Sequence, residues 1–144
     1  MTLEPQTFDV RACLEELVQE TAGDRASEVH IDVPPSLEVT CDTNAFERVV
    51  SNLLANARSH GRPPVRISGN HRNRHLWIAV EDAGEGVPEP LRARLFERFE
   101  RGIAGEGTGL GLAIAKAYAI AHGGDLRHVP TERGARFELI LPVG

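Results

Sequence analysis

The sequence predicts a mixed α+β fold, a two-layer α/β sandwich in which helices cover one face of a mixed β-sheet. The apolar side chains of residues 46–57 fall within one helical sector of about 140°, which predicts an amphipathic helix. Short apolar or alternating segments, such as residues 29–33 and 75–81, predict strands. Helices and strands do not alternate regularly along the chain. This order favours one mixed sheet with its helices on a single face.

Apolar periodicity and terminal residues predict four helices. They span residues 8–23, 42–61, 91–99 and 110–122. The second helix has two candidate N-caps, Asp42 and Asn44, because either side chain can accept a hydrogen bond from a first-turn N–H. Glycines end three of these helices, at Gly23, Gly61 and the pair 123–124.

Five strands are predicted between and after the helices. They span residues 29–33, 37–40, 65–68, 75–81 and 136–141. The third and fourth strands are expected to form a hairpin, joined through Gly69–Asn70 and a basic turn. Pro142 is expected to stop the last strand.

The composition predicts one soluble, cytoplasmic domain. The chain has 144 residues, of which 41% are hydrophobic and 26% are charged. The net charge of −5 and the scattered Lys and Arg residues argue against nucleic-acid binding. No membrane-length apolar segment or signal pattern is present. Cys13 and Cys41 lack metal-ligand spacing and suit a reduced protein, and the isolated domain is expected to be monomeric.

The most informative feature is a pair of asparagines one helical turn apart. Asn52 and Asn56 share a stripe beside the apolar sector of their helix. Asn56 can offer its carbonyl oxygen to a Mg²⁺ ion that also carries substrate phosphates, and Asn52 can orient a phosphate or a magnesium-bound water. Alternatively, both amides tie the helix to neighbouring backbone. Arg58, on the same helix, can neutralise phosphate charge or be an ordinary surface residue.

Two glycine-rich loops follow the asparagine helix. In the first, Asp82 ends an apolar strand, where its carboxylate can accept a hydrogen bond from an exocyclic amine. Gly84 and Gly86 would let the backbone approach a flat ring, although a plain Asp-Gly turn is the alternative.

The second loop opens a helix, where free N–H groups and the helix dipole suit a phosphate. It consists of Gly107, Thr108, Gly109, Leu110 and Gly111. It is not a Walker loop, because no Gly-Lys-Ser/Thr follows, and no strand precedes it as a dinucleotide fingerprint requires.

Taken in order, these motifs closely resemble the ATP-binding catalytic domain of bacterial sensor histidine kinases. The wider superfamily includes gyrase, heat-shock chaperones and mismatch-repair ATPases. The matching segments are residues 52–57 (asparagine box), 82–86 (first glycine box), 95–101 (phenylalanine box), 107–114 (second glycine box), 122–124 and 134–142. The resemblance implies a single catalytic domain over residues 1–144 with the Bergerat-type ATP-binding fold, in which ATP lies under a lid at residues 101–107.

The same resemblance implies a role for each site residue. Asp82 would contact the adenine amino group, and Asn56 would ligate Mg²⁺. Asn52, Arg58 and Arg98 would lie near the phosphates as the catalytic residues. The remaining nucleotide-binding residues would be Gly84, Gly86, Gly107, Thr108, Gly109, Leu110 and Gly111.

The amide at Asn52 favours phosphoryl transfer over hydrolysis. Hydrolysing members of the superfamily generally carry a water-activating glutamate at the corresponding position, and an amide cannot act as a general base at neutral pH. We therefore expect a protein histidine kinase that binds ATP and Mg²⁺ and supplies the γ-phosphoryl group to a histidine in two-component signalling.

The histidine acceptor itself is expected to lie elsewhere. None of the six histidines has the acidic or polar neighbour and nearby Arg of a phosphoacceptor helical hairpin. The partner is therefore a separate dimerisation and phosphoacceptor domain, in cis in a longer chain or in trans, with a response regulator downstream.

Three other functions remain as alternatives. An anti-sigma-factor-type serine kinase shares the fold, but the longer phenylalanine box argues against it. A nucleotide-gated interaction module without transfer is disfavoured by the intact Asp82, Asn56 and glycine set. An ATPase is disfavoured by Asn52.

Overall fold

The computed structural model of the chain describes residues 4–96 and 108–143, without the side chains of residues 108–110. The helices are α1 (Val10–Ala22), the short 3₁₀ helix η1 (Gly23–Glu28), α2 (Thr43–His60), α3 (Glu89–Arg92) and α4 (Thr108–Ala121). The strands are β1 (Pro5–Asp9), β2 (Val29–Asp32), β3 (Glu38–Asp42), β4 (Val65–Arg72), β5 (His75–Glu81), β6 (Asp125–Val129) and β7 (Arg136–Pro142).

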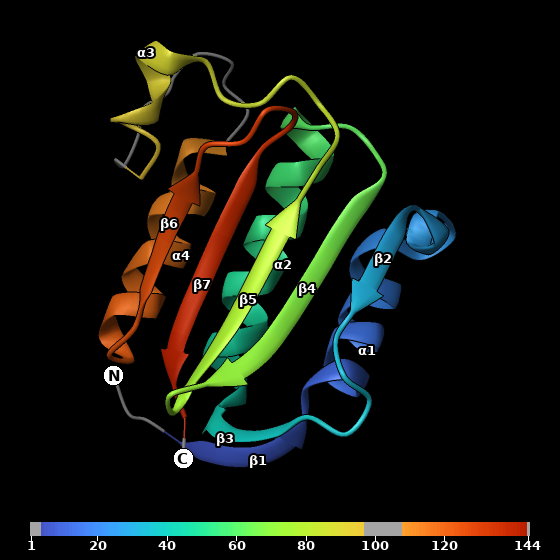
Figure 1. Cartoon of the computed structure of the whole chain (residues 1–144), viewed down its shortest axis with the longest axis vertical. Coiled ribbons are helices and arrows are strands. Elements are labelled where there is room, and N and C mark those ends of the chain that lie inside the picture. Colours follow the sequence, from blue (N-terminus) through green and yellow to red (C-terminus); the bar gives the residue numbers. More distant parts are fainter. Residues whose placement is uncertain (1–3, 97–107, 144) are drawn as a thin grey trace.

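The architecture is the predicted mixed sheet with helices on one face. Five strands pair in the order β2-β4-β5-β7-β6; β2 and β4 are parallel, and the other neighbours are antiparallel. Figure 1 shows α1, α2 and α4 behind this sheet, while its other face is open. A second, two-stranded sheet of β1 and β3 lies at one end, which the prediction of a single sheet did not include.

The core lies between the sheet and α2. The helix buries Phe46, Val49, Val50, Leu53, Leu54 and Ala57, which is the predicted apolar sector. On β5, Leu76, Ile78 and Val80 point into the same core, since alternate residues of a strand face one side of the sheet. Burial of one such side chain contributes roughly 1.5–3 kcal/mol, so this layer fixes the helix on the sheet.

The sheets contain strands that the sequence did not predict. β1 and β6 were not predicted, and Phe8 lies in β1 rather than in the first helix, with its ring 5.3 Å from that of Phe46. Both strands have five residues and are defined by pairing with β3 and β7, respectively.

The hairpin turn between β4 and β5 lies at Asn73–Arg74, within the basic turn that the sequence predicted, but the expectation that Gly69–Asn70 belong to the connection was wrong. Asn73 and Arg74 both have positive φ angles, 50° and 63°, as a two-residue turn of type I′ requires. Gly69 and Asn70 instead pair within the ladder, opposite Ile78 and Trp77. Gly69 is required there by packing, because a Cβ would lie 2.7 Å from the Cδ1 atom of Ile78.

The third predicted helix is shorter than expected. It is confined to α3, beginning after Pro88, and residues 93–96 form turns instead. The last three positions of the predicted range, 97–99, lie outside the described residues.

Asp42 is the N-cap of α2 and joins three elements. Its Oδ1 atom accepts a hydrogen bond from Ala45 N (3.1 Å), and its Oδ2 atom accepts one from Glu4 N (3.2 Å). The Nε2 atom of His122, at the end of α4, lies 3.5 Å from the same Oδ2. Burial by itself would raise the pKa of Asp42, but the two backbone N–H groups and His122 lower it below its usual value.

Removing this cap tests its contribution to stability. We expect Asp42→Ala to lower the free energy of unfolding by about 1–2 kcal/mol in urea denaturation, because an orphan N–H of α2 loses its acceptor. Asp42→Asn retains a capping oxygen and is expected to lose less. The charge-dependent part of the stability is present above the unfolded pKa of about 3.9 and is lost as pH falls through the lower folded pKa. A urea midpoint of Asp42→Asn that follows pH as steeply as that of the parent chain would contradict this.

Candidate functional site

The elements that carry most of the predicted site residues meet at one end of the sheet, although Asn52 itself lies in the middle of α2. Figure 1 shows that α2 and β5 end, and that α4 begins, at the end of the molecule near α3. Asn52 and Asn56 lie on α2, Asp82 follows β5, and Thr108 opens α4. Gly107 and Arg98 lie outside the described residues.

Asn52 and Asn56 are half-buried on one flank of α2. Their neighbours Leu53 and Ala57 are buried against the core, which leaves the two carboxamides at its edge. Neither carboxamide makes a hydrogen bond with any residue that the structure describes. The described part of the chain therefore offers no structural partner for this pair, so the alternative that they tie the helix to neighbouring backbone finds no support there.

Arg58 lies on the other flank of the same helix. At 100° per residue it is about 200° around the axis from Asn56. Its Nη1 atom donates a hydrogen bond to the carbonyl oxygen of Thr21 in α1, at 2.5 Å. The structure therefore does not bring Arg58 together with Asn52 and Asn56, although the three are close in sequence.

The loop that carries Asp82 is fixed to two neighbouring segments. Asp82 N donates to Ala135 O (3.1 Å), next to the start of β7, and Ala83 N donates to Arg62 O (2.9 Å), just after α2. Within the loop, Gly84 N donates to Asp82 Oδ1 (2.7 Å). The other carboxylate oxygen, Oδ2, has no hydrogen bond to a described residue, so it remains free to accept one from a ligand.

Two glycines that the sequence did not identify as site residues shape this loop. A Cβ at Gly61, the residue after α2, would lie 2.2 Å from the Cγ atom of Asp82. Gly134 has a φ angle of +70°, and a Cβ there would lie 1.9 Å from the backbone oxygen of Asp82. The sequence explained Gly61 only as a helix end, and nothing in the order of residues connects positions 61 and 134 with Asp82.

Gly86 and Gly111 differ in the space that the fold leaves for a Cβ atom. Gly86 has a φ angle of +85°, and a Cβ there would meet Gly134 O at 2.7 Å, so the fold itself requires this glycine. Gly111 lies in the first turn of α4, where a Cβ would have no neighbour within 4 Å. Packing between described residues therefore does not explain Gly111, whereas close approach of a ligand to the backbone would.

Phe96 anchors the segment before residues 97–107. Its ring lies 6.1 Å from that of Phe137 in β7, in an edge-to-face arrangement, and Lys116 Nζ of α4 lies 4.7 Å from its centroid. Lys116 Nζ also donates to Leu126 O at 2.8 Å. The phenylalanine segment is thus joined to both α4 and the sheet.

A metal ion at this site would need ligands from a bound nucleotide as well as from the protein. Among residues 4–96 and 108–143, no group of three or more His, Cys, Asp or Glu side chains could hold a metal. The free carboxamide of Asn56 suits Mg²⁺ only if phosphate oxygens complete the coordination, which is how Mg²⁺ is usually held beside nucleotides.

Comparisons with known proteins agree on one family. Its model, described as histidine kinase-, DNA gyrase B- and HSP90-like ATPase, matches residues 41–144. The signal transduction histidine-protein kinase AfsQ2 of Streptomyces coelicolor is 37% identical over 120 residues, covering 79% of this chain and 22% of that protein. This chain therefore spans about a fifth of that relative's length.

Solved structures agree over almost the whole chain. The histidine kinase domain of the E. coli osmosensor EnvZ is 32% identical with a TM-score of 0.73, covering 96% of this chain and 89% of that one. The mycobacterial sensor histidine kinase MprB is 29% identical with a TM-score of 0.77, covering 99% and 98%. No helix in the described part of the chain is long and apolar enough to span a membrane.

The close approach of Gly61 to Asp82 can be tested directly. We expect Gly61→Ala to displace the Asp82 carboxylate, to shift the amide resonance of Gly84 and to weaken binding of ATP at least tenfold in calorimetry. Ser59→Ala, at an exposed position on the same helix end, is the control and is expected to change neither measurement. Full affinity in a folded Gly61→Ala protein would show that this contact does not position Asp82.

Proposed function

Because the chain belongs to the family of histidine kinase-, DNA gyrase B- and HSP90-like ATPases, we propose that it binds ATP with Mg²⁺ and supplies the γ-phosphoryl group to a histidine. It is an ATP-binding domain of the kind found in sensor histidine kinases. The acceptor histidine would belong to a dimeric helical-hairpin domain, in the same longer chain or in another. A response regulator would receive the phosphoryl group afterwards, and the domain would therefore act in the cytoplasm.

The observation that carries the proposal is the free amide pair on α2. Asn52 and Asn56 are half-buried, lack partners among the described residues, and lie one turn apart on α2. Since the amide of Asn52 cannot take a proton from water, the site favours positioning of ATP over hydrolysis.

The other described residues can be given roles from the same geometry. Asp82 would accept a hydrogen bond from the adenine amino group through its free Oδ2, while Oδ1 remains with Gly84 N–H. The first turn of α4, including Gly111, would place backbone N–H groups near the phosphates. Mg²⁺, bound by Asn56 and phosphate oxygens, would supply charge neutralisation. Arg98 would contact the phosphates, a role that rests on the family resemblance alone. Arg58 is not proposed for that role, because it is bonded to Thr21.

Labelled ATP tests the proposed reaction. We expect γ-labelled ATP to stay intact over hours with this chain alone and Mg²⁺, and to label the helical-hairpin domain of a related kinase such as AfsQ2 when that domain is added. The label on histidine should be labile in acid. An acid-stable label would indicate a serine kinase instead, and steady phosphate release that Asp82→Asn abolishes would indicate an ATPase.

The adenine contact is tested by Asp82→Asn. We expect ATP affinity to fall at least tenfold, or about 1.4 kcal/mol, because an amide replaces a charged acceptor. Asp32→Asn removes the same charge from an exposed ion pair on β2 and is expected to leave affinity unchanged. Equal calorimetric affinities for Asp82→Asn and the parent chain would remove Asp82 from the adenine site.

The metal contact is tested by Asn56→Ala. We expect this variant to lose most of the Mg²⁺-dependent part of nucleotide binding, because it loses its carbonyl ligand. Asn44→Ala, an exposed asparagine in the first turn of the same helix, is the matched control. If titrations with and without Mg²⁺ show the same metal dependence in Asn56→Ala and the parent chain, Asn56 does not hold the ion.

A further inference from the structure

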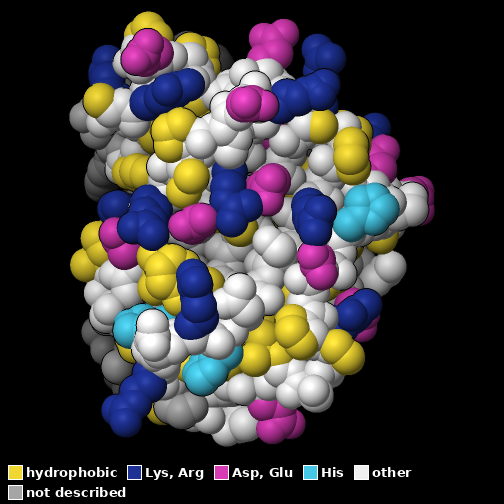
Figure 2. Space-filling model, viewed as in Figure 1, with side chains coloured by type: hydrophobic (Ala, Val, Ile, Leu, Met, Phe, Trp, Pro, Cys, Tyr) yellow, Lys and Arg dark blue, Asp and Glu magenta, His cyan; other side chains and the backbone are white. Residues whose placement is uncertain are grey.

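The open face of the sheet carries a hollow that the proposed kinase activity does not use. Its volume is about 350 Å³, and its floor is formed by small residues of β4 and β5, namely Ser68, Gly69 and Ala79. Ser68 and Ala79 are direct cross-strand neighbours, so no large side chain fills the space above them. Figure 2 shows this side of the molecule, whereas Figure 1 shows α1, α2 and α4 behind the sheet.

One wall of the hollow is an aromatic ring with two guanidinium groups packed near it. The Cζ atom of Arg72 lies 4.6 Å from the Trp77 ring centroid, and that of Arg127 lies 5.7 Å from it. The Nε1 atom of Trp77 is buried and donates no hydrogen bond to any described residue. Both arginines are thus held over an apolar surface, which places their N–H groups at the rim of the hollow.

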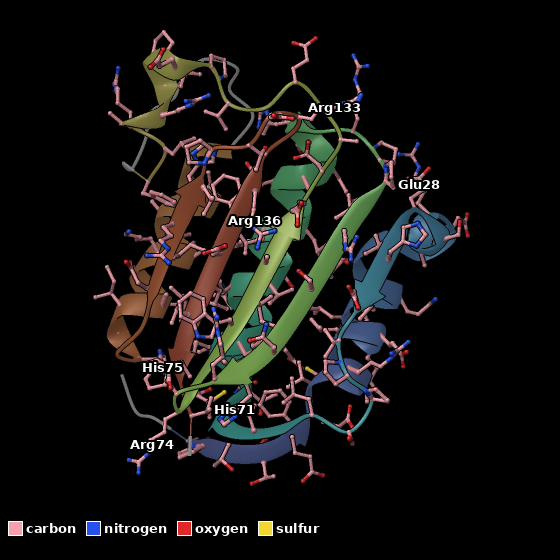
Figure 3. All side chains as sticks on the ribbon, viewed as in Figure 1. Glu28, His71, Arg74, His75, Arg133 and Arg136 are labelled. Carbon is pink, nitrogen blue, oxygen red and sulfur yellow. The ribbon has the colours of Figure 1, made fainter. Side chains whose placement is uncertain are left out.

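The polar groups around the hollow have an excess of donors. Glu138 is its only acidic lining residue among those described, and it already pairs with Arg136 (3.1 Å) and Arg127 (3.5 Å). Arg136 also pairs with Glu81, and Figure 3 shows its side chain over the middle of the open face. Arg72 has no acidic partner in the described part of the chain.

Arg74 adds a further positive charge at the adjacent hairpin turn. Arg72 lies at the end of β4, and Figure 3 shows His71, Arg74 and His75 grouped around the same turn. The surface therefore offers guanidinium donors without enough carboxylates to satisfy them. A carboxylate is the ligand that completes such a set, because guanidinium groups bind it through charge-assisted hydrogen bonds.

We propose that this hollow is a docking site for an acidic segment of a partner protein, which places a carboxylate between Arg72 and Arg127 beside Trp77. The hollow is shallow and lies on an open sheet face, where a side chain presented by another protein can enter. A nucleic acid is disfavoured, because its many phosphates would meet a chain with a net charge of −5. A short acidic segment, unlike a nucleic acid, would contact only the basic surface and not the negatively charged remainder of the chain.

Trp77 provides a direct probe, since it is the only tryptophan in the chain. We expect titration of the whole chain with a hexaglutamate peptide at low salt to shift the indole N–H resonance in a saturable way. Arg72→Gln and Arg127→Gln should each weaken the apparent affinity at least fivefold. Arg25→Gln removes the same charge from exposed η1 and should change it less than twofold.

A charge-neutral variant separates a defined site from general attraction. Ser68→Leu fills the floor of the hollow and is expected to weaken peptide binding while the protein remains folded and still binds ATP. The proposal is overturned if the indole resonance does not shift, if Arg25→Gln weakens binding as much as Arg72→Gln does, or if inorganic phosphate or an oligo-dT strand binds more tightly than the peptide. ATP binding is measured separately, so failure here leaves the proposed kinase function untouched.

Discussion

The contact between the end of α2 and the loop after β5 joins the helix that carries Asn52 and Asn56 to the loop that carries Asp82. It is possible only because Gly61 and Gly134 have no Cβ, which lets two backbone segments approach Asp82 more closely than any other residue allows. Hydrogen bonds from Asp82 N to Ala135 O and from Ala83 N to Arg62 O then hold the loop in place. The Asp82 carboxylate and the α2 amides are thereby fixed to one rigid layer, and a ligand does not have to order them.

Local sequence signals were sufficient for most of the fold. The apolar sector of α2 predicted its buried face, and Asp42 and Gly61 predicted its ends, because periodicity and capping depend on neighbours within one or two turns. β1 was not predicted because its partner β3 lies beyond α1 and β2 in the chain, and β6 was not predicted because its apolar residues, Leu126 and Val129, do not alternate. The turn at Asn73–Arg74 was displaced from Gly69 for a related reason: a glycine inside a strand can meet a packing demand instead of forming a turn.

The candidate site was predictable in part. Asn52, Asn56 and Asp82 could be selected from residue type and spacing, because helix periodicity and the end of a strand place them without tertiary information. The orientation of Arg58 could not be predicted, since it depends on a hydrogen bond to Thr21 in another helix. The importance of Gly61 to Asp82 is likewise a distance across the fold and leaves no local pattern.

Asp42 connects the two ends of the molecule through α4. This helix begins with Thr108 at the end of the molecule near α3 and, over 14 residues, reaches the opposite end beside His122, which faces Asp42. A helix of that length extends about 21 Å and resists axial compression. A displacement of α4 along its axis would therefore change the distance between His122 and Asp42, whose carboxylate also accepts a hydrogen bond from Glu4 N. The helix α4 is therefore a mechanical connection between its own first turn and the amino-terminal segment at Glu4.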